Sequence, residues 1–373
     1  MKITIVTGAF FPVPPILGGA VEKVWFALGQ EFVRRGHEVT HISRAHPELP
    51  TEETIAGVKH RRVSGFAQPR SIVRLKLLDL IYSLGVWRIL PRADILVTNT
   101  FWLPLLVRGT KHGLIYVHVQ RGPKGQMKWY AHVARLCAVS RAIADEIVAQ
   151  APGLRAKVAV LPNALPFRIE SLPNEKRERA LLFVGRVHPE KGLQLLLHAL
   201  GLLPVELRAK WKIKIVGPHE IEFGGGGVAF LHEMQRLGEE SGAKIEWCGR
   251  IFDAAELSRQ YRSAPLFIYP SVAETGEALP VAPLEAMASG CAPIVSALAC
   301  FRDYVKDDAN GFVFDHRTPE PAQSLAARLA QILQLPEEEL APIGQAARAT
   351  ATEFSVENVA PRYLADFESL LKL

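Results

Sequence analysis

Short apolar runs alternate along this chain with longer segments of helical periodicity. Residues 2–7 form the first run, residues 20–35 carry a helical pattern that ends at Gly36, and residues 38–43 form the second run. Later runs of strand length occupy residues 94–99, 113–118, 136–139, 211–216, 244–247, 266–269 and 293–295, and one more begins at Leu181. Strands that alternate with helices predict parallel, doubly wound α/β sheets.

A break in this alternation separates two series of elements. The segment LPNALP at residues 161–166, followed by the polar stretch 168–179, is typical of an interdomain linker. A chain of 373 residues also exceeds what one hydrophobic core usually supports. We therefore expect two α/β domains.

Two carboxylates lie in the segment EALPVAPLEAMASG, residues 277–290. Good helix formers, a proline suited to a first turn and Gly290 as a stop predict a helix that begins just after Glu277 and carries Glu285. Free N–H groups at its positive end can hold a diphosphate, and the carboxylates can accept hydrogen bonds from sugar hydroxyls. The spacing alone also fits two surface glutamates on an ordinary helix.

A strand-to-helix loop upstream carries two cations. Residues 181–192, LLFVGRVHPEKG, place Arg186 and Lys191 between an apolar run and the helical LQLLLHAL. Such loops gather at the carboxyl ends of strands, where α/β proteins bind ligands, and a guanidinium and an ammonium make complementary phosphate contacts. Two solvated cations at a helix start are the alternative interpretation.

With both segments in this order, the chain resembles the family 4 retaining glycosyltransferases of GT-B fold. The resemblance covers most of the chain, and it also rests on Gly18-Gly19, His118 after a strand, LPNALP, and Asn310-Gly311-Phe312-Val313. It implies two doubly wound Rossmann-like domains that face a central cleft, residues 1–167 for the acceptor and residues 168–350 for the nucleotide sugar. We expect residues 351–373 to form a terminal helix that packs back on the first domain.

Carried over residue by residue, the family pattern implies a role for each matching position. Arg186 and Lys191 would clamp the diphosphate. Glu285 would accept hydrogen bonds from the ribose, and Glu277 would hold the hydroxyls of the donor sugar. The other expected site residues are His118 near the donor sugar, Gly18 and Gly19 facing the phosphate and acceptor, and Gly185, Arg250 and Val281 in the donor site.

The implied reaction is transfer from a nucleotide diphosphate sugar to a hydroxyl acceptor with retention at the anomeric carbon. Negative charge develops on the departing diphosphate, and fixed cations and N–H groups can stabilise it. The sequence has neither an Asp-x-Asp pair nor an HExxH motif, so we expect no metal and no cofactor besides the sugar donor. Neither Gly18-Gly19 nor residues 224–227, which we interpret as a flexible loop, completes the GxGxxG of a nicotinamide enzyme.

One departure from the family pattern keeps other classes open. Where the family usually has Glu-x-Phe-Gly, this chain has Glu277-Ala278-Leu279-Pro280, and a proline offers no N–H. A catalytically inert GT-B scaffold or partner subunit is one alternative, and a nucleotide-sugar epimerase, whose motifs differ, is another. A glycoside hydrolase needs two carboxyl groups about 5–10 Å apart around one bond, which a ribose role for Glu285 does not satisfy.

Composition agrees with a globular cytoplasmic protein. Of its residues 49% are hydrophobic and 22% are charged, and the four cysteines are scattered without metal-site spacing. Disulfides are rare in such chains unless they are secreted, so a reducing compartment is expected. No apolar run approaches the ~20 residues that span a bilayer.

The charge is concentrated in the first half. Residues 1–168 hold 23 Lys and Arg against 10 Asp and Glu, a net charge of +13, whereas the remainder carries −7. Such a field favours an anionic acceptor or lipid surface, and it does not indicate nucleic acid without aromatic interleaving or a known module.

Residues 69–90, PRSIVRLKLLDLIYSLGVWRIL, combine this charge with a large apolar content through Arg70, Arg74, Lys76 and Arg88. An interfacial helix would have this composition, and so would a sheet-packing helix with a solvated basic face. With the family resemblance, the sequence predicts a cytoplasmic enzyme, peripheral at the inner face of a membrane. Its acceptor would be a sugar, lipid-linked or anionic, in bacterial surface polysaccharide or glycolipid synthesis.

Overall fold

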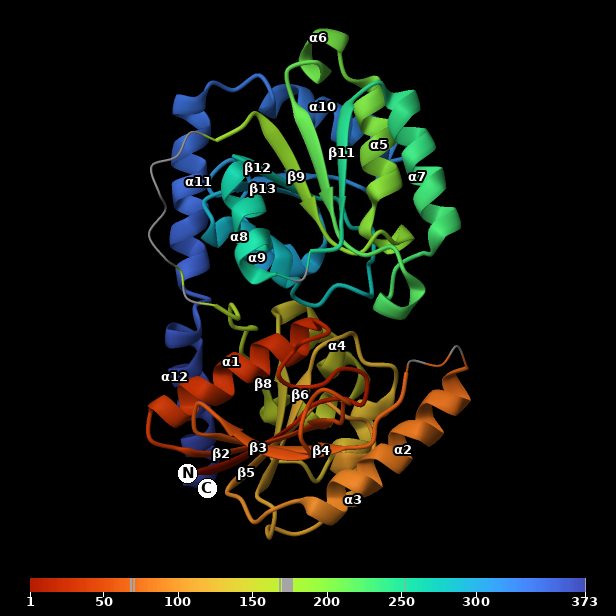
Figure 1. The fold of residues 1–373 in the computed structure, drawn as a ribbon. Helices are drawn as coiled ribbons and strands as arrows, with labels where there is room; N and C mark the ends of the chain where they lie inside the picture. The colour runs from red at the N-terminus through yellow and green to blue at the C-terminus, as the bar shows by residue number, and fades with distance from the viewer. Residues whose placement is uncertain (68, 70, 168, 170–176, 252, 373) are drawn as a thin grey trace. The chain divides into compact units, whose positions relative to one another are not determined.

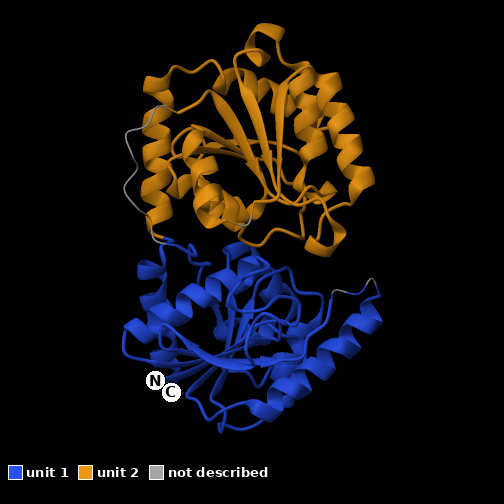
Figure 2. Cartoon of the chain, viewed as in Figure 1, with its two compact units in different colours: residues 1–168, 354–373 blue, residues 169–353 orange. Residues whose placement is uncertain are grey.

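The computed structural model describes residues 1–67, 69, 71–167, 169, 177–251 and 253–372. The chain forms two compact units, one of residues 1–168 with 354–373 and one of residues 169–353 (Figure 2). Each unit contains a sheet of mostly or entirely parallel strands with helices on its faces (Figure 1). The structure thus confirms the doubly wound α/β fold expected for each half. Arg70 lies outside the described residues, and so do residues 168 and 170–176 of the predicted linker.

The first unit is built on an eight-stranded sheet in the order β3-β4-β2-β1-β5-β6-β7-β8, parallel except where β3 meets β4. The central strand β1 pairs on both sides, with Ile3 opposite Val39 and Ile95. Because helices cover both faces, the central strands β1, β5 and β6 are largely apolar. The strands are β1 (Lys2–Val6), β2 (Glu38–Arg44), β3 (Glu52–Ile55), β4 (Val58–Val63), β5 (Ile95–Thr98), β6 (Leu114–Val119), β7 (Arg135–Ala138) and β8 (Val158–Val160).

The helices of this unit include the last helix of the chain. It is α12 (Val356–Leu371), which lies against α1 (Ala20–Arg34), where the rings of Phe32 and Phe367 meet with centroids 5.9 Å apart. Burial of both rings ties the terminal helix to the first unit. The other helices are α2 (Ile72–Ile89), α3 (Leu103–Leu106) and α4 (Arg141–Gln150), with 3-10 turns η1 (Gln126–Tyr130) and η2 (Pro152–Lys157).

The second unit has a six-stranded parallel sheet in the order β11-β10-β9-β12-β13-β14. Its strands are β9 (Ala180–Val184), β10 (Lys212–Val216), β11 (Lys244–Gly249), β12 (Leu266–Tyr269), β13 (Ala292–Ser296) and β14 (Phe312–Phe314). Its helices are α5 (Leu193–Leu202), α6 (Val205–Arg208), α7 (Val228–Ser241), α8 (Ala254–Ser263), α9 (Val281–Ala288), α10 (Pro321–Ile332) and α11 (Glu337–Thr352), with η3 (Pro189–Lys191), η4 (Ile221–Phe223) and η5 (Ala299–Asp303).

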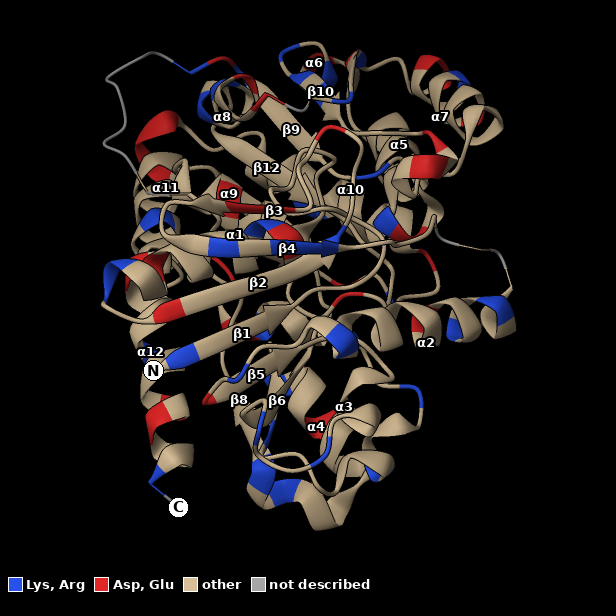
Figure 3. Ribbon diagram, turned by 60° about the horizontal axis from the view of Figure 1, so that its bottom comes forward, with Lys and Arg blue, Asp and Glu red and all other residues tan. Residues whose placement is uncertain are grey.

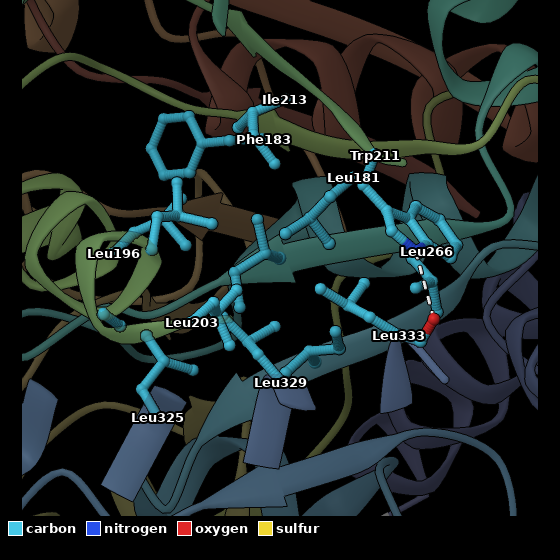
Figure 4. Close-up of a cluster of buried hydrophobic side chains, with 14 of the residues drawn as sticks. Leu181, Phe183, Leu196, Leu203, Trp211, Ile213, Leu266, Leu325, Leu329 and Leu333 are labelled. Carbon is cyan, nitrogen blue, oxygen red and sulfur yellow. Dashed lines mark hydrogen bonds between the residues drawn. The ribbon is translucent and has the colours of Figure 1, made fainter. Parts of the chain in front are cut away.

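One apolar core joins this sheet to the helices on one of its faces. Leu181 and Phe183 of β9 pack with Leu196 of α5 and Leu329 of α10, all fully buried (Figure 4). The indole of Trp211 lies at the edge of this cluster and donates its N–H to the carbonyl of Leu333 over 3.1 Å. This core fixes β9, and with it the loop that follows β9.

One local expectation was wrong. The LPNALP segment does not begin the linker, because the N–H of Leu161 bonds the carbonyl of Ala138, the N–H of Leu165 bonds the carbonyl of Phe354, and both leucines are buried in the first unit. Helix α9 begins at Val281, shortly after Glu277 as expected, with Pro280 at its N-cap in an extended conformation.

Candidate functional site

The loop after β9 is held against the loop after β12 by backbone contacts. A Cβ at Gly192, whose φ is +69°, would lie 1.9 Å from the carbonyl oxygen of Pro270, so only glycine allows this approach. The N–H of Val272 donates to the carbonyl of Glu190 over 3.0 Å. Ser296 adds a hydroxyl bond of 2.6 Å to the carbonyl of Ser271. The side chains on these two loops therefore have fixed relative positions.

Lys191 and Glu277 form an ion pair at this junction. The ammonium of Lys191 contacts Oε1 of Glu277, and the two side chains are 11% and 6% exposed. The same oxygen accepts from Tyr269 over 3.0 Å and from Ser271 over 2.9 Å. Lys191 also lies over the Tyr269 ring, 5.3 Å from its centroid. A cation and an anion are thus held together at the carboxyl edge of the sheet, where α/β proteins bind ligands.

Arg186 belongs to the same loop and points toward the four glycines at residues 224–227. Its Nη1 donates to the carbonyl of Gly224 over 2.6 Å, and its Nη2 lies 3.7 Å from Glu190. Gly185 precedes it, bonded through its N–H to Val216, and a Cβ there would meet the rings of Phe183 and Tyr269. Arg250, after β11, stacks on Phe223 with the guanidinium carbon 3.9 Å from the ring centroid. Both arginines therefore lie beside residues 223–224.

Helix α9 carries the second glutamate. Glu285 is 8% exposed, and its Oε2 accepts the hydroxyl of Tyr261 over 2.8 Å. At the start of the helix, Pro280 and Pro283 lack N–H groups, so Val281 and Ala282 supply the free donors of the first turn. Pro280 has no N–H, but the N–H of Val281 is still present at the start of the helix.

Gly18, Gly19 and His118 belong to the first unit. Gly19 is the N-cap of α1 with a φ of 93°, and a Cβ there would lie 2.2 Å from Oε2 of Glu22. Glu22 is buried, which raises its pKa to about 7, while its own backbone N–H and the charge of Arg121 act in the opposite direction. The start of α1 therefore combines a turn with positive φ and a buried carboxyl group.

His118 lies inside the first unit, with both ring nitrogens bonded. Its Nδ1 contacts the indole N–H of Trp25 at 3.2 Å and the amide of Gln120 at 2.6 Å, and its Nε2 contacts the hydroxyl of Tyr363 at 2.9 Å. Burial lowers the pKa of His118 to about 3, so the ring is neutral. It joins β6 to α1 and α12.

Three residues of this site were absent from the sequence prediction: Tyr261, Tyr269 and Ser271. A signal did exist for the last two, because Tyr269 ends the apolar run of β12 and Ser271 follows Pro270, at the point where a parallel strand ends. In the part of the chain that the structure describes, no group of three His, Cys, Asp or Glu side chains is arranged to hold a metal ion. None of the described helices is long and apolar enough to cross a membrane.

The whole fold is shared with solved glycosyltransferases. Anabaena HepE in complex with UDP-glucose superimposes with a TM-score of 0.72 over 99% of this chain and all of that one, at 18% identity. The fold is thus that of the GT-B glycosyltransferases, with two α/β sheets of eight and six strands.

Two family models cover most of the chain. The model described as Glycosyltransferase Family 4 matches residues 18–166, and Glycosyl transferases group 1 matches residues 166–350. The chain belongs to this glycosyltransferase family, as the sequence motifs indicated.

Sequence relatives carry related descriptions. An uncharacterized glycosyltransferase of Methanocaldococcus jannaschii is 24% identical over 357 residues, 86% of each chain. The O-antigen chain mannosyltransferase B of Escherichia coli is 31% identical over 153 residues, 41% of this chain and 36% of the relative.

Proposed function

We propose that this protein is a retaining, metal-independent hexosyltransferase that uses a nucleotide diphosphate sugar. The observation that carries the proposal is the buried Lys191–Glu277 pair between the β9 and β12 loops. Lys191 has three N–H bonds to offer and gives one to Glu277, so it can also bind phosphate oxygens. Glu277 keeps its second oxygen for a sugar hydroxyl. A cation for the diphosphate, Lys191, and a hydrogen-bond acceptor for the sugar, Glu277, are then adjacent, as a sugar diphosphate requires.

The reacting charge develops on the leaving diphosphate. Lys191, the forked guanidinium of Arg186 and the N–H of Val281 are proposed to stabilise it, which is the kind of fixed electrostatic effect that contributes several kcal/mol. Arg186 would then exchange its bond to Gly224 for phosphate. Glu285, on α9, would accept from the ribose hydroxyls. Glu277 orients the sugar and is not assigned as a nucleophile.

These residues predict activity without a divalent cation, because side-chain cations and N–H groups meet the diphosphate charge. We expect transfer to continue in the presence of a chelator such as EDTA. The measurement is initial rate with and without EDTA, with Mg²⁺ or Mn²⁺ restored afterwards. Loss of activity with the chelator and recovery with metal would contradict metal independence.

The acceptor is proposed to be a lipid-linked or anionic sugar at the cytoplasmic face of a membrane. Helix α2 exposes Val73, Leu77 and Ile81 on consecutive turns, with Arg74 and Lys76 exposed beside them. Lys and Arg lie along this helix and along β4 (Figure 3). The partial match to an O-antigen mannosyltransferase supports synthesis of a bacterial surface polysaccharide or glycolipid.

The two glutamates provide the test of the donor site. Glu285→Gln should weaken a nucleoside diphosphate by about tenfold or more, because a hydrogen bond to a charged group contributes about 1.5–3 kcal/mol. Glu277→Gln should leave that affinity equal or higher, because it frees Lys191, while kcat/KM for the sugar donor falls. Calorimetric titration with UDP, GDP and ADP and steady-state transfer assays measure both quantities.

A surface control separates charge from position. Glu240→Gln removes a carboxylate that is paired with Arg236 on α7 and half exposed, and it should change neither binding nor transfer. Equal loss of nucleotide affinity in the Glu277 and Glu285 variants would refute the division of roles. A protein that neither transfers nor hydrolyses any sugar of the nucleotide it binds would be an inert member of the family.

A further inference from the structure

Two buried tyrosines each donate to one of the two glutamates. Tyr261, on α8, donates its hydroxyl to Oε2 of Glu285 over 2.8 Å. Tyr269, at the end of β12, donates to Oε1 of Glu277 over 3.0 Å. The exposed fractions of the two tyrosines are 3% and 4%. One oxygen of each carboxylate is thus held by a hydrogen bond from a buried phenol.

The direction of these hydrogen bonds is set by burial. Burial, followed by the charge of the neighbouring glutamate, raises the pKa of both Tyr261 and Tyr269 well above the ordinary value. Both phenols therefore stay protonated, and a protonated phenol beside a carboxylate must donate.

Ser271 assists Tyr269 at Glu277. Its hydroxyl lies 2.9 Å from Oε1 of Glu277 and 2.9 Å from the carbonyl of Glu190. The hydroxyl has one proton for these two acceptors, and the charged carboxylate of Glu277 is the stronger acceptor of the two. Oε1 of Glu277 then receives three donors: Lys191, Tyr269 and Ser271. Every hydrogen bond that the described residues make to this carboxylate reaches Oε1, which leaves Oε2 to a ligand.

We propose that Tyr269 and Tyr261 are positioning residues that act on different parts of the donor. Tyr269, with Ser271, fixes Glu277 so that its second oxygen meets the sugar. Tyr261 fixes Glu285 so that its other oxygen meets the nucleoside. The inference rests on the proposed function, because the parts of the ligand are those of a nucleotide sugar.

The test replaces each hydroxyl by hydrogen. Tyr269→Phe keeps the ring beneath Lys191 and removes only the bond to Glu277. It should leave the dissociation constant of the nucleoside diphosphate within about twofold and lower kcat/KM for the sugar donor about tenfold, because Glu277 loses one of the charge-assisted hydrogen bonds that hold it. Tyr261→Phe should weaken the nucleoside diphosphate about five- to tenfold and lower kcat/KM in proportion, with little further change in kcat.

A matched control and a second variant complete the design. Tyr116→Phe removes a buried phenol that donates to Asp366 over 2.8 Å in the other unit, so it costs a similar bond without touching a glutamate of the site. It should change stability alone. If Tyr269→Phe fails to fold, Ser271→Ala is expected to show the same separation between diphosphate affinity and transfer.

The outcomes distinguish this inference from the proposed function. Equal effects of the two Tyr→Phe variants on diphosphate affinity, or no effect of either on binding or transfer, would overturn the positioning roles while the glycosyltransferase assignment stands. Failure of the unmodified protein to bind any nucleoside diphosphate would overturn the proposed function and this inference with it.

Discussion

Glu22 is a carboxyl group whose ionisation opposes folding of the first unit. It is 6% exposed at the start of α1, and burial raises its pKa from 4.5 to about 7. Because the folded pKa is the higher one, the stability that comes with the protonated carboxyl group is complete below pH 4.5. It is lost as the pH rises through 7 and the group ionises. The difference corresponds to about 3 kcal/mol of unfolding free energy.

Glu22→Gln should therefore stabilise the protein above neutral pH. The amide stays neutral, so we expect the variant to exceed the unmodified protein by up to about 3 kcal/mol at pH 8 and by much less at pH 5. Urea unfolding followed at both pH values measures this, with the transitions of the two units fitted separately. Glu48→Gln, at an exposed position, is the control and should show no such dependence. An equal effect of Glu22→Gln at both pH values would exclude buried ionisation as the cause.

At the residue scale, the sequence indicated candidate residues but not their contacts. Lys191 and Glu277 were both predicted from their motifs, and the structure pairs them. Tyr261 could not be assigned, because a hydroxyl on a helix gains its role only from what packs opposite it in the fold. His118 shows the same limit: its partners Trp25 and Tyr363 are far from it in sequence.

At the scale of elements, apolar runs located the central strands well. The edge hairpin β3–β4 was missed, because residues 52–63, EETIAGVKHRRV, are rich in charged residues and have neither a long apolar run nor a regular alternation. Helix α9 was predicted from its helix formers and its prolines, and it begins at Val281, with Pro280 at its N-cap. Helix α2 buries Tyr82 and Val86, as a helix that packs on the sheet would, and leaves Val73 and Leu77 exposed.

Gly192 is the position where one element most depends on one residue. Alanine there would carry a φ of +69° and place its Cβ 1.9 Å from the carbonyl oxygen of Pro270. We expect Gly192→Ala to cost about 3 kcal/mol, combining left-handed strain of about 1 kcal/mol with the backbone shift that relieves the overlap. Since that shift moves Lys191, nucleoside diphosphate affinity should fall as well.

Gly36→Ala is the matched control for this prediction. Gly36 also has a positive φ, +87°, but nothing lies within 4 Å of the Cβ position, so only the strain remains. Thermal unfolding and calorimetric titration of the two variants measure the difference. Similar losses of stability in both, or full nucleotide affinity in Gly192→Ala, would show that the contact with Pro270 does not hold the loop.

At the scale of the whole molecule, the division into two α/β units follows from length and from the alternation of elements, and the sequence predicted both. The LPNALP segment, which the sequence assigned to the linker, packs instead in the first unit, whose first stretch ends at residue 168. Charge also divides the chain: residues 1–168 carry +13 and the remainder −7. A field of this kind acts on any partner that is large and anionic.

This asymmetry predicts reversible binding of the protein to anionic vesicles. Each basic residue near an anionic leaflet contributes about 1 kcal/mol, and the exposed side chains of Val73, Leu77 and Ile81 add apolar area on α2. We expect co-sedimentation with phosphatidylglycerol vesicles that falls as salt is raised and falls again in Arg74→Ser/Lys76→Ser. Replacement of Leu77 and Ile81 by Ser should reduce binding at every salt concentration.

Lys210→Ser/Arg236→Ser removes the same charge from exposed positions of the second unit and should leave binding unchanged. Equal recovery in the supernatant with anionic and neutral vesicles would favour a soluble acceptor.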